Sequence, residues 1–232
     1  MKIYAVLLLI VFSSLTTLAQ KSINFELKKQ LDSILQTDQG IREFVDSETS
    51  EKRKDTLAQF FNYPKEELKK QAWNIMPKID SINLKKVEAI ISKYGYPGKT
   101  LVGEPANTVV FYVIQHNPSK ISQYYPLIEK AGKEGELPFK YTAMMLDRKL
   151  GQEGKEQVYG TQVYGVMINN PQTGKKEFFQ YVIPIKNAKN VNKRRKKAGF
   201  DSTVEVNALR LGIVYKAYTK KEIDKIVKPK IN

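Results

Sequence analysis

The chain contains one histidine, and its position suits a proton-transfer group. His116 follows the apolar run 109–114 and precedes Pro118, so it should stand at the C-terminal end of a helix. The negative end of the helix dipole favours an imidazolium there, and imidazole exchanges protons near neutral pH. The sequence predicts a general acid or base at His116, with Gln115 beside it as a candidate ligand-binding residue. Alternatively, the ring only hydrogen-bonds the last carbonyls of its helix.

Two neighbouring charged residues, Asp147 and Arg148, are candidate partners of this histidine. They project about 100° apart on a helix, so they do not point to one spot unaided. Asp147 would either orient His116 or form a structural salt bridge with Arg194 or Arg195, since buried acids usually have a cationic partner. In a hydrolase of glycan or peptide, His116 would transfer the proton, Asp147 would orient it, and Arg148 or Gln162 would stabilise developing negative charge.

A polar loop, residues 159–162, precedes the first predicted strand and offers a phenol, a hydroxyl and an amide from Tyr159, Thr161 and Gln162. Loops on a rigid scaffold often carry binding groups, so these side chains would suit a sugar or peptide. In the alternative interpretation, Thr161 and Gln162 only satisfy backbone groups of a turn. Combined with His116 and the Asp-Arg pair, the loop predicts a small polar pocket that binds a component of the cell envelope.

Several site classes are excluded by composition. The chain has no cysteine and a single histidine, which removes thiol catalysis, disulfides and thiolate metal sites. No acid cluster has the spacing of a calcium loop, and the glycines at 151 and 154 lack the preceding strand of a phosphate-binding loop. We therefore expect no metal and no cofactor.

The elements that must position these residues are mostly helices. Helical periodicity covers residues 23–35, 41–61, 64–76, 83–94, 120–133 and 138–150, and a short basic helix is predicted at 189–197 with Gly199 as its stop. The run 109–114 is apolar nearly all round, which is typical of a buried central helix, although a buried strand is the rival interpretation. Two β-branched and aromatic runs, 163–168 and 178–183, predict one hairpin.

The predicted fold class is α+β: mainly α, built around a buried central helix, with a small C-terminal β-hairpin at 163–183. We expect one mostly helical domain over residues 20–232, and the pattern leaves the conformation of 200–232 open. The helix at 138–150 should end at Gly151 and bury one apolar face, formed by Phe139, Ala143, Leu146 and Leu150.

The N-terminus has the order of a secretory signal: Lys2, an apolar run over 3–12, and small residues before Gln20. The run holds about ten residues, and a membrane-spanning helix needs about twenty, so cleavage after Ala19 is favoured over an uncleaved anchor. We expect residues 1–19 to be removed and the protein to be exported, either periplasmic or secreted. Without cysteine it is not a lipoprotein, and no transmembrane segment is expected after cleavage.

The net charge of +15 is concentrated in one region. About +11 of it lies after Asn169, around the basic run 193–197. In an envelope the available polyanions are lipid head groups, lipopolysaccharide and acidic glycans, so an anionic surface rather than nucleic acid is the expected partner. The chain could thus be an interaction protein that docks on acidic surfaces, or the run could be a solvated helix face.

Short pieces of the sequence occur in a recognisable order: Tyr96-Pro97-Gly98, Val102-Gly103-Glu104, Gln115-His116, Asp147-Arg148, Tyr159-Gly160-Thr161-Gln162, Pro184-Ile185 and Arg194-Arg195 before Gly199. In this order and spacing the chain resembles a bacterial family known as domain of unknown function 6624, with a family-like core at about 84–200. Asp38-Gln39 and Arg42 also suit the N-terminal half of that family.

The resemblance implies a shared fold and a shared polar site, but no reaction. We count Arg194 and Arg195 among the candidate ligand-binding residues, because matched arginines among variable lysines suggest specific partners inside the fold. The chain departs from the family at Asn187 and Asn192, where acidic residues are typical. If those acids belong to a site, this member has lost two charges.

Overall fold

The computed structural model describes residues 22–170 and 173–227. These residues form ten α-helices and one two-stranded antiparallel sheet, which confirms a mainly α fold with a small hairpin. The predicted signal sequence, 1–19, lies outside the described residues. Among the described residues, no helix combines the length and the apolar character that crossing a membrane requires.

Three helices form the N-terminal part: α1 (Phe25–Val45), α2 (Glu51–Phe60) and α3 (Lys65–Tyr94). Asn24 and Ser50 cap α1 and α2, each accepting a hydrogen bond from a backbone N–H of the first turn. The prediction of separate helices at 64–76 and 83–94 was wrong, because α3 continues through Pro77. An interior proline removes one backbone hydrogen bond, and the long packing of α3 against α1 outweighs that loss.

The central part consists of α4 (Lys99–Val102), α5 (Val109–Gln115), α6 (Ile121–Lys133) and α7 (Phe139–Gln152). The apolar residues of α5 except Tyr112 are completely buried and join the largest hydrophobic core with residues of α1, α3, α6 and α7. The buried central helix is therefore confirmed, and the rival strand interpretation is wrong.

The buried face of α7 differs from the predicted one. Phe139 is 39% exposed, and the helix instead buries Thr142, Ala143, Met145 and Asp147. α7 packs closely on α6, where a Cβ added to Gly132 would lie 2.1 Å from Oγ1 of Thr142. Because Gly132 has no side chain, α7 approaches α6 closely and Thr142 is buried between the two helices. Gly151 does not stop α7, which runs on to Gln152.

The C-terminal part begins with the hairpin of β1 (Val163–Asn169) and β2 (Lys176–Val182), which pair from Val163 opposite Val182 to Asn169 opposite Lys176. Three helices follow: α8 (Val191–Lys197), α9 (Val204–Arg210) and α10 (Lys220–Val227). The predicted basic helix is confirmed as α8, and Gly199 after it adopts a φ of 84°, a conformation that favours glycine.

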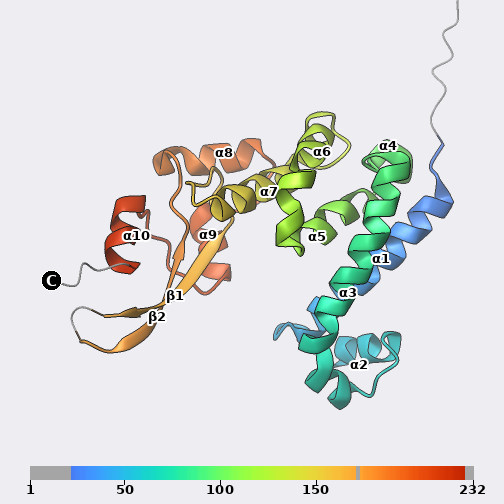
Figure 1. Ribbon diagram of the computed structural model, residues 1–232, viewed down its shortest axis with the longest axis horizontal. Coiled ribbons are helices and arrows are strands. Elements are labelled where there is room, and N and C mark those ends of the chain that lie inside the picture. Colours follow the sequence, from blue (N-terminus) through green and yellow to red (C-terminus); the bar gives the residue numbers. More distant parts are fainter. Residues whose placement is uncertain (1–21, 171–172, 228–232) are drawn as a thin grey trace, which may run out of the picture.

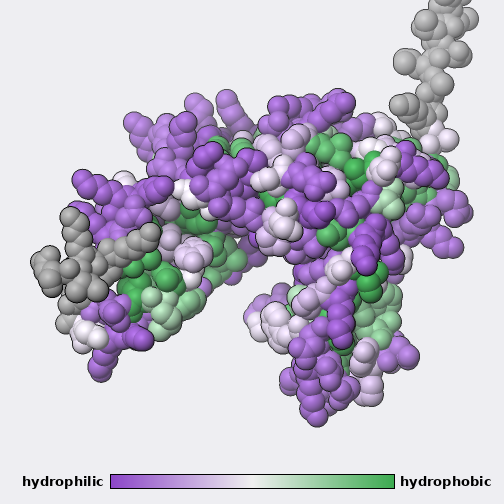
Figure 2. Space-filling model, in the orientation of Figure 1, coloured by the Kyte–Doolittle hydropathy of each residue, from purple (hydrophilic) through white to green (hydrophobic). Residues whose placement is uncertain are grey.

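The three parts follow one another along an arch (Figure 1). The hairpin and α10 form one end, α2 and the adjoining end of α3 form the other, and α5 lies between them. Figure 2 shows a hollowed face between the two ends and a mostly hydrophilic surface over α8. The central helix α5 thus stands where the N-terminal helices meet the rest of the chain.

Candidate functional site

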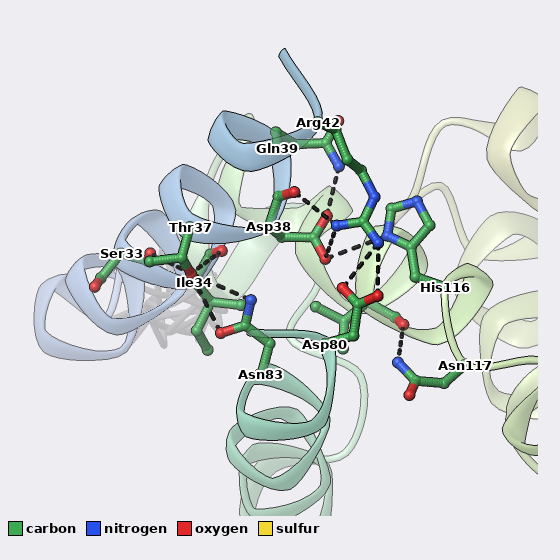
Figure 3. A network of polar contacts seen from close by, with 11 residues as sticks. Ser33, Ile34, Thr37, Asp38, Gln39, Arg42, Asp80, Asn83, His116 and Asn117 are labelled. Carbon is green, nitrogen blue, oxygen red and sulfur yellow. Dashed lines mark hydrogen bonds and ion pairs between the residues drawn. The ribbon is translucent and has the colours of Figure 1, made fainter. Parts of the chain in front are cut away.

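His116 follows the last residue of α5, as predicted, but its partner is a residue of α1 (Figure 3). The ring Nδ1 lies 3.2 Å from Oδ1 of Asp38, whose side chain is 1% exposed. A buried carboxylate at this distance fixes the ring and leaves Nε2 for another group. The alternative in which the ring bonds the helix carbonyls is not the arrangement found.

A second charge pair supports this contact. Both Nη2 contacts of Arg42 to the carboxylate of Asp80 measure 2.8 Å, and Nη1 of Arg42 lies 3.5 Å from Oδ1 of Asp38. Gln39 donates to the other oxygen of Asp38. Two carboxylates thus face one permanent cation, and a protonated His116 would balance the remaining negative charge.

Helical spacing explains how these groups meet. Asp38 lies on the inward face of α1, four residues after Ile34, and Arg42 follows one turn later. Asp80 and Asn83 lie one turn apart on α3, and Asn83 joins α3 to α1 through its hydrogen bond with Thr37. The sequence drew attention to Asp38 and Arg42 only through the family resemblance. Asp80 was missed, and a polar pair on the α1-facing side of a long helix was its only signal.

The same cluster has the composition of a metal site. One ligand atom each from Asp38, Asp80 and His116 lies within 4.8 Å of the others. Both carboxylates already contact the guanidinium of Arg42, which supplies the positive charge that a metal ion would bring. We therefore describe the cluster as an ion-pair network around a histidine, not as a metal centre.

Asp147 has a different partner from the one proposed for it. Its completely buried carboxylate accepts hydrogen bonds from the backbone N–H groups of Val158, Tyr159 and Thr161 and from the hydroxyl of Thr161, at 2.7–3.1 Å. Burial raises the pKa of Asp147, although these hydrogen bonds act in the opposite direction. Asp147 therefore anchors a loop, and Asp38 holds the position at His116 that the sequence analysis offered to Asp147.

Arg194 and Arg195 hold the same loop from its carbonyl side. Arg194 donates from Nε to the carbonyl of Val158, and Arg195 donates from Nη1 to the carbonyl of Tyr159, both at 2.9 Å. Arg195 is 1% exposed and also bonds the carbonyl and hydroxyl of Ser202. Both arginines act inside the fold, so the expectation of specific internal partners holds and their assignment as ligand contacts gains no support.

In the loop of residues 159–162, Thr161 and Gln162 form hydrogen bonds with other residues of the protein. Thr161 donates to Asp147, Gln162 donates to Thr161, and the backbone N–H of Gln162 donates to the buried Gln157. Gly160 has a φ of 69°, and a Cβ there would lie 2.6 Å from a methyl of Val204. These contacts correspond to the alternative interpretation of a satisfied turn.

Three of the predicted side chains remain without such roles. The phenol of Tyr159 makes no hydrogen bond with a described residue, and its ring centroid lies 6.1 Å from the Phe200 ring centroid. Among the described residues, neither the amide of Gln115 nor the guanidinium of Arg148 has a hydrogen-bond or ion-pair partner. Gln115 is 9% exposed, and burial lowers the pKa of Arg148. They remain available for a ligand.

A cavity of about 360 Å³ lies elsewhere, between the end of α7, the hairpin and α10. Tyr164, Tyr181, Lys155 and Lys220 are among its lining residues, and none of the predicted site residues is. The small polar pocket expected from the sequence therefore does not coincide with this cavity.

Comparison with known proteins gives a family and no further relatives. No curated protein and no solved structure matches the chain. The model of a family of unknown function matches residues 26–220, a span that includes Asp38, Asp80, His116 and Arg195. The chain therefore belongs to the family of unknown function DUF6624.

Proposed function

We propose that the chain is an exported hydrolase in which His116 transfers protons and Asp38 orients it. The observation that carries this proposal is the 3.2 Å contact between Nδ1 of His116 and the buried carboxylate of Asp38. A carboxylate on Nδ1 keeps the proton on that nitrogen and presents the lone pair of Nε2 outward, which is the arrangement of a general base. The proposal of export rests on the signal-like segment 1–19. The proposed substrate class follows from export, because glycans and peptides are components of the cell envelope.

The proton balance of the reaction is simple. Nε2 of neutral His116 takes a proton from a water molecule as its oxygen attacks the substrate, and the imidazolium then gives that proton to the leaving group. The nearby carboxylates stabilise the imidazolium between the two steps, and His116 ends as it began. Arg42 holds Asp80 bidentately and is the positioning residue of the cluster.

The tautomer of His116 tests the proposal without a substrate. Because it is the only histidine, long-range ¹H–¹⁵N NMR of the untagged protein reports this ring alone. At a pH where the ring is neutral, we expect the proton on Nδ1 in the wild type and on Nε2 in Asp38→Ala, where the acceptor is gone. Asp32→Ala, a half-buried acid on the same helix, is the matched control and should keep the wild-type tautomer. An Nε2–H ring in the wild type contradicts the proposal.

Activity on dye-labelled cell-wall glycan and on fluorogenic peptides completes the test. His116→Ala is expected to lose about 10²-fold or more of kcat with its folding retained, since general acid–base catalysis contributes that much. Asp32→Ala should remain active. Hydrolysis that persists unchanged in His116→Ala would show that the ring does not transfer the proton.

A second candidate function is docking on an anionic surface through α8. While Arg194 and Arg195 turn inward, Lys193, Lys196 and Lys197 are exposed, and none of them forms a salt bridge with a described residue. Binding to vesicles that contain phosphatidylglycerol should weaken strongly as salt rises from about 50 to about 500 mM. Reversing Lys193 and Lys197 to glutamate should abolish binding, and reversing Lys130 and Lys133 on α6 should not. Salt-independent binding would exclude this role.

A further inference from the structure

Two polar side chains of the central helices, one buried and one half-buried, have no protein partner among the described residues. Gln115 ends α5 at 9% exposure, and Arg148 is half-buried on α7. Within residues 22–170 and 173–227, neither side chain makes a hydrogen bond or an ion pair. Among the described residues, the fully buried side-chain atoms without a partner are Oδ1 of Asn107 and the hydroxyl of Tyr215, so the polar atoms of Gln115 and Arg148 still reach solvent. An amide and a guanidinium without a protein partner are donors open to a bound molecule.

Contacts between α5 and α7 on either side of these residues indicate that the two helices carry them on facing surfaces. The Phe111 ring of α5 lies 4.9 Å from the Tyr141 ring of α7, and Gln152 donates to the carbonyl of Pro118 at 3.2 Å. Gln115 is one turn beyond Phe111. Arg148 is two turns beyond Tyr141 and one turn before Gln152, on the same face of α7. The stretch from Phe111 to Pro118 therefore runs beside the stretch that carries Arg148.

The surroundings leave the charge of Arg148 without local compensation. The adjacent Asp147 turns away, because its carboxylate accepts the hydrogen bonds of the loop at Val158, Tyr159 and Thr161. Burial lowers the pKa of Arg148, and no neighbouring acid opposes that shift. The positive charge is thus kept in a partly dehydrated position, which strengthens its attraction for an anion.

The chemistry of the two side chains specifies the partner. A guanidinium donates two parallel hydrogen bonds to a carboxylate or a phosphate, and a glutamine amide adds a third donor. His116 follows Gln115 directly, so Gln115 lies at the same end of α5 as the proton-transfer group. We propose that Gln115 and Arg148 bind an oxyanion of the substrate, either a carboxylate or a phosphate, next to His116. This inference rests on the proposed function and gives its substrate a negative charge.

Anion binding is tested with inorganic phosphate and acetate as probes, at constant ionic strength. In ¹⁵N-labelled protein we expect one of them, at millimolar concentration, to shift the Nε–H signal that is absent from Arg148→Met. Binding should weaken about tenfold or more in Arg148→Met, and less in Arg148→Lys, which keeps the charge and loses the fork. Preference for acetate or for phosphate identifies the substrate group. Arg53→Met, which removes an exposed arginine paired with Glu43, should bind as the wild type does.

Stability separates a binding role from a structural one. Because Arg148 has no partner among the described residues, Arg148→Met should melt at the same temperature as the wild type or higher. A lower melting temperature, or equal anion binding by the wild type and Arg148→Met, overturns the inference, as does the absence of any shift with both anions. His116→Ala should still bind the anion. Failure of the anion site would therefore appear as lost anion binding, and failure of the proton-transfer role would appear as unchanged hydrolysis in His116→Ala.

Discussion

Replacing Asp147 by alanine is expected to lower the free energy of unfolding by about 3–5 kcal/mol. Three backbone N–H groups and the hydroxyl of Thr161 converge on this completely buried carboxylate. Without it, those donors remain inside the protein with nothing to accept their hydrogens, and Arg195 loses a compensating negative charge. Urea denaturation of the wild type and the variant measures the difference.

Two further variants define the control. Asp147→Asn keeps the shape but points an amide NH₂ at backbone donors, so it should cost about 2 kcal/mol. Asp32→Ala, the half-buried acid of α1 paired only with Lys28 among the described residues, should change stability by less than about 0.5 kcal/mol. A loss below about 1 kcal/mol in Asp147→Ala would mean that water replaces the carboxylate, and that the loop is not anchored by it.

The pH dependence of stability is an independent test of the role of Asp147. Burial raises the pKa of Asp147 above its ordinary value of 3.8, so the folded protein binds this proton more readily than the unfolded chain does. The contribution of Asp147 to the free energy of unfolding therefore increases as the pH falls from the raised pKa of the folded state toward 3.8. A salt-bridged carboxylate shows the opposite dependence. The stability advantage of the wild type over Asp147→Asn should widen on acidification across that window.

Local sequence patterns were sufficient to predict much of the architecture. The buried α5, the hairpin and the basic α8 follow from local patterns of apolar and charged residues, each of which the surrounding structure reinforces. The predicted break in α3 was wrong because tertiary packing outweighs local propensity. Proline lowers the helix propensity of one turn, and packing along a thirty-residue helix compensates for that loss. The predicted face of α7 failed because Gly132 admits Thr142 closely.

The site was harder to predict because its partners are distant in the chain. His116 and Asp38 are 78 residues apart, and no local pattern specifies that α1 presents Asp38 to the end of α5. The sequence pattern suggested Asp147 instead, but its carboxylate accepts hydrogen bonds from the backbone N–H groups of a loop. Polar residue types indicated candidate positions, and only packing distinguished the histidine cluster from the loop anchor.

Replacing Arg195 by methionine is expected to cost about 3 kcal/mol, although methionine fills a similar volume. Arg195 donates to the carbonyl of Ser202 at 2.8 Å and to that of Tyr159 at 2.9 Å, and its guanidinium lies 4.4 Å from the Phe200 ring centroid. Lysine should recover only part of this loss, because it lacks the guanidinium fork that donates to both carbonyls. Lys196→Met, an exposed change on the same helix, is the matched control and should be nearly neutral.

A double-mutant cycle between Arg195 and Asp147 tests whether the two residues form one anchor. Asp147 binds the N–H of Tyr159 and Arg195 binds its carbonyl, so loss of either residue frees the peptide groups that the other holds. Once Asp147→Ala has released the loop, Arg195→Met should cost about 1–2 kcal/mol less than it does in the wild type. Additive losses would mean that the two contacts act on separately stabilised parts of the chain. Strong coupling would instead make residues 158–161 a single structural unit, separate from the histidine cluster and from the proposed anion site at Gln115 and Arg148.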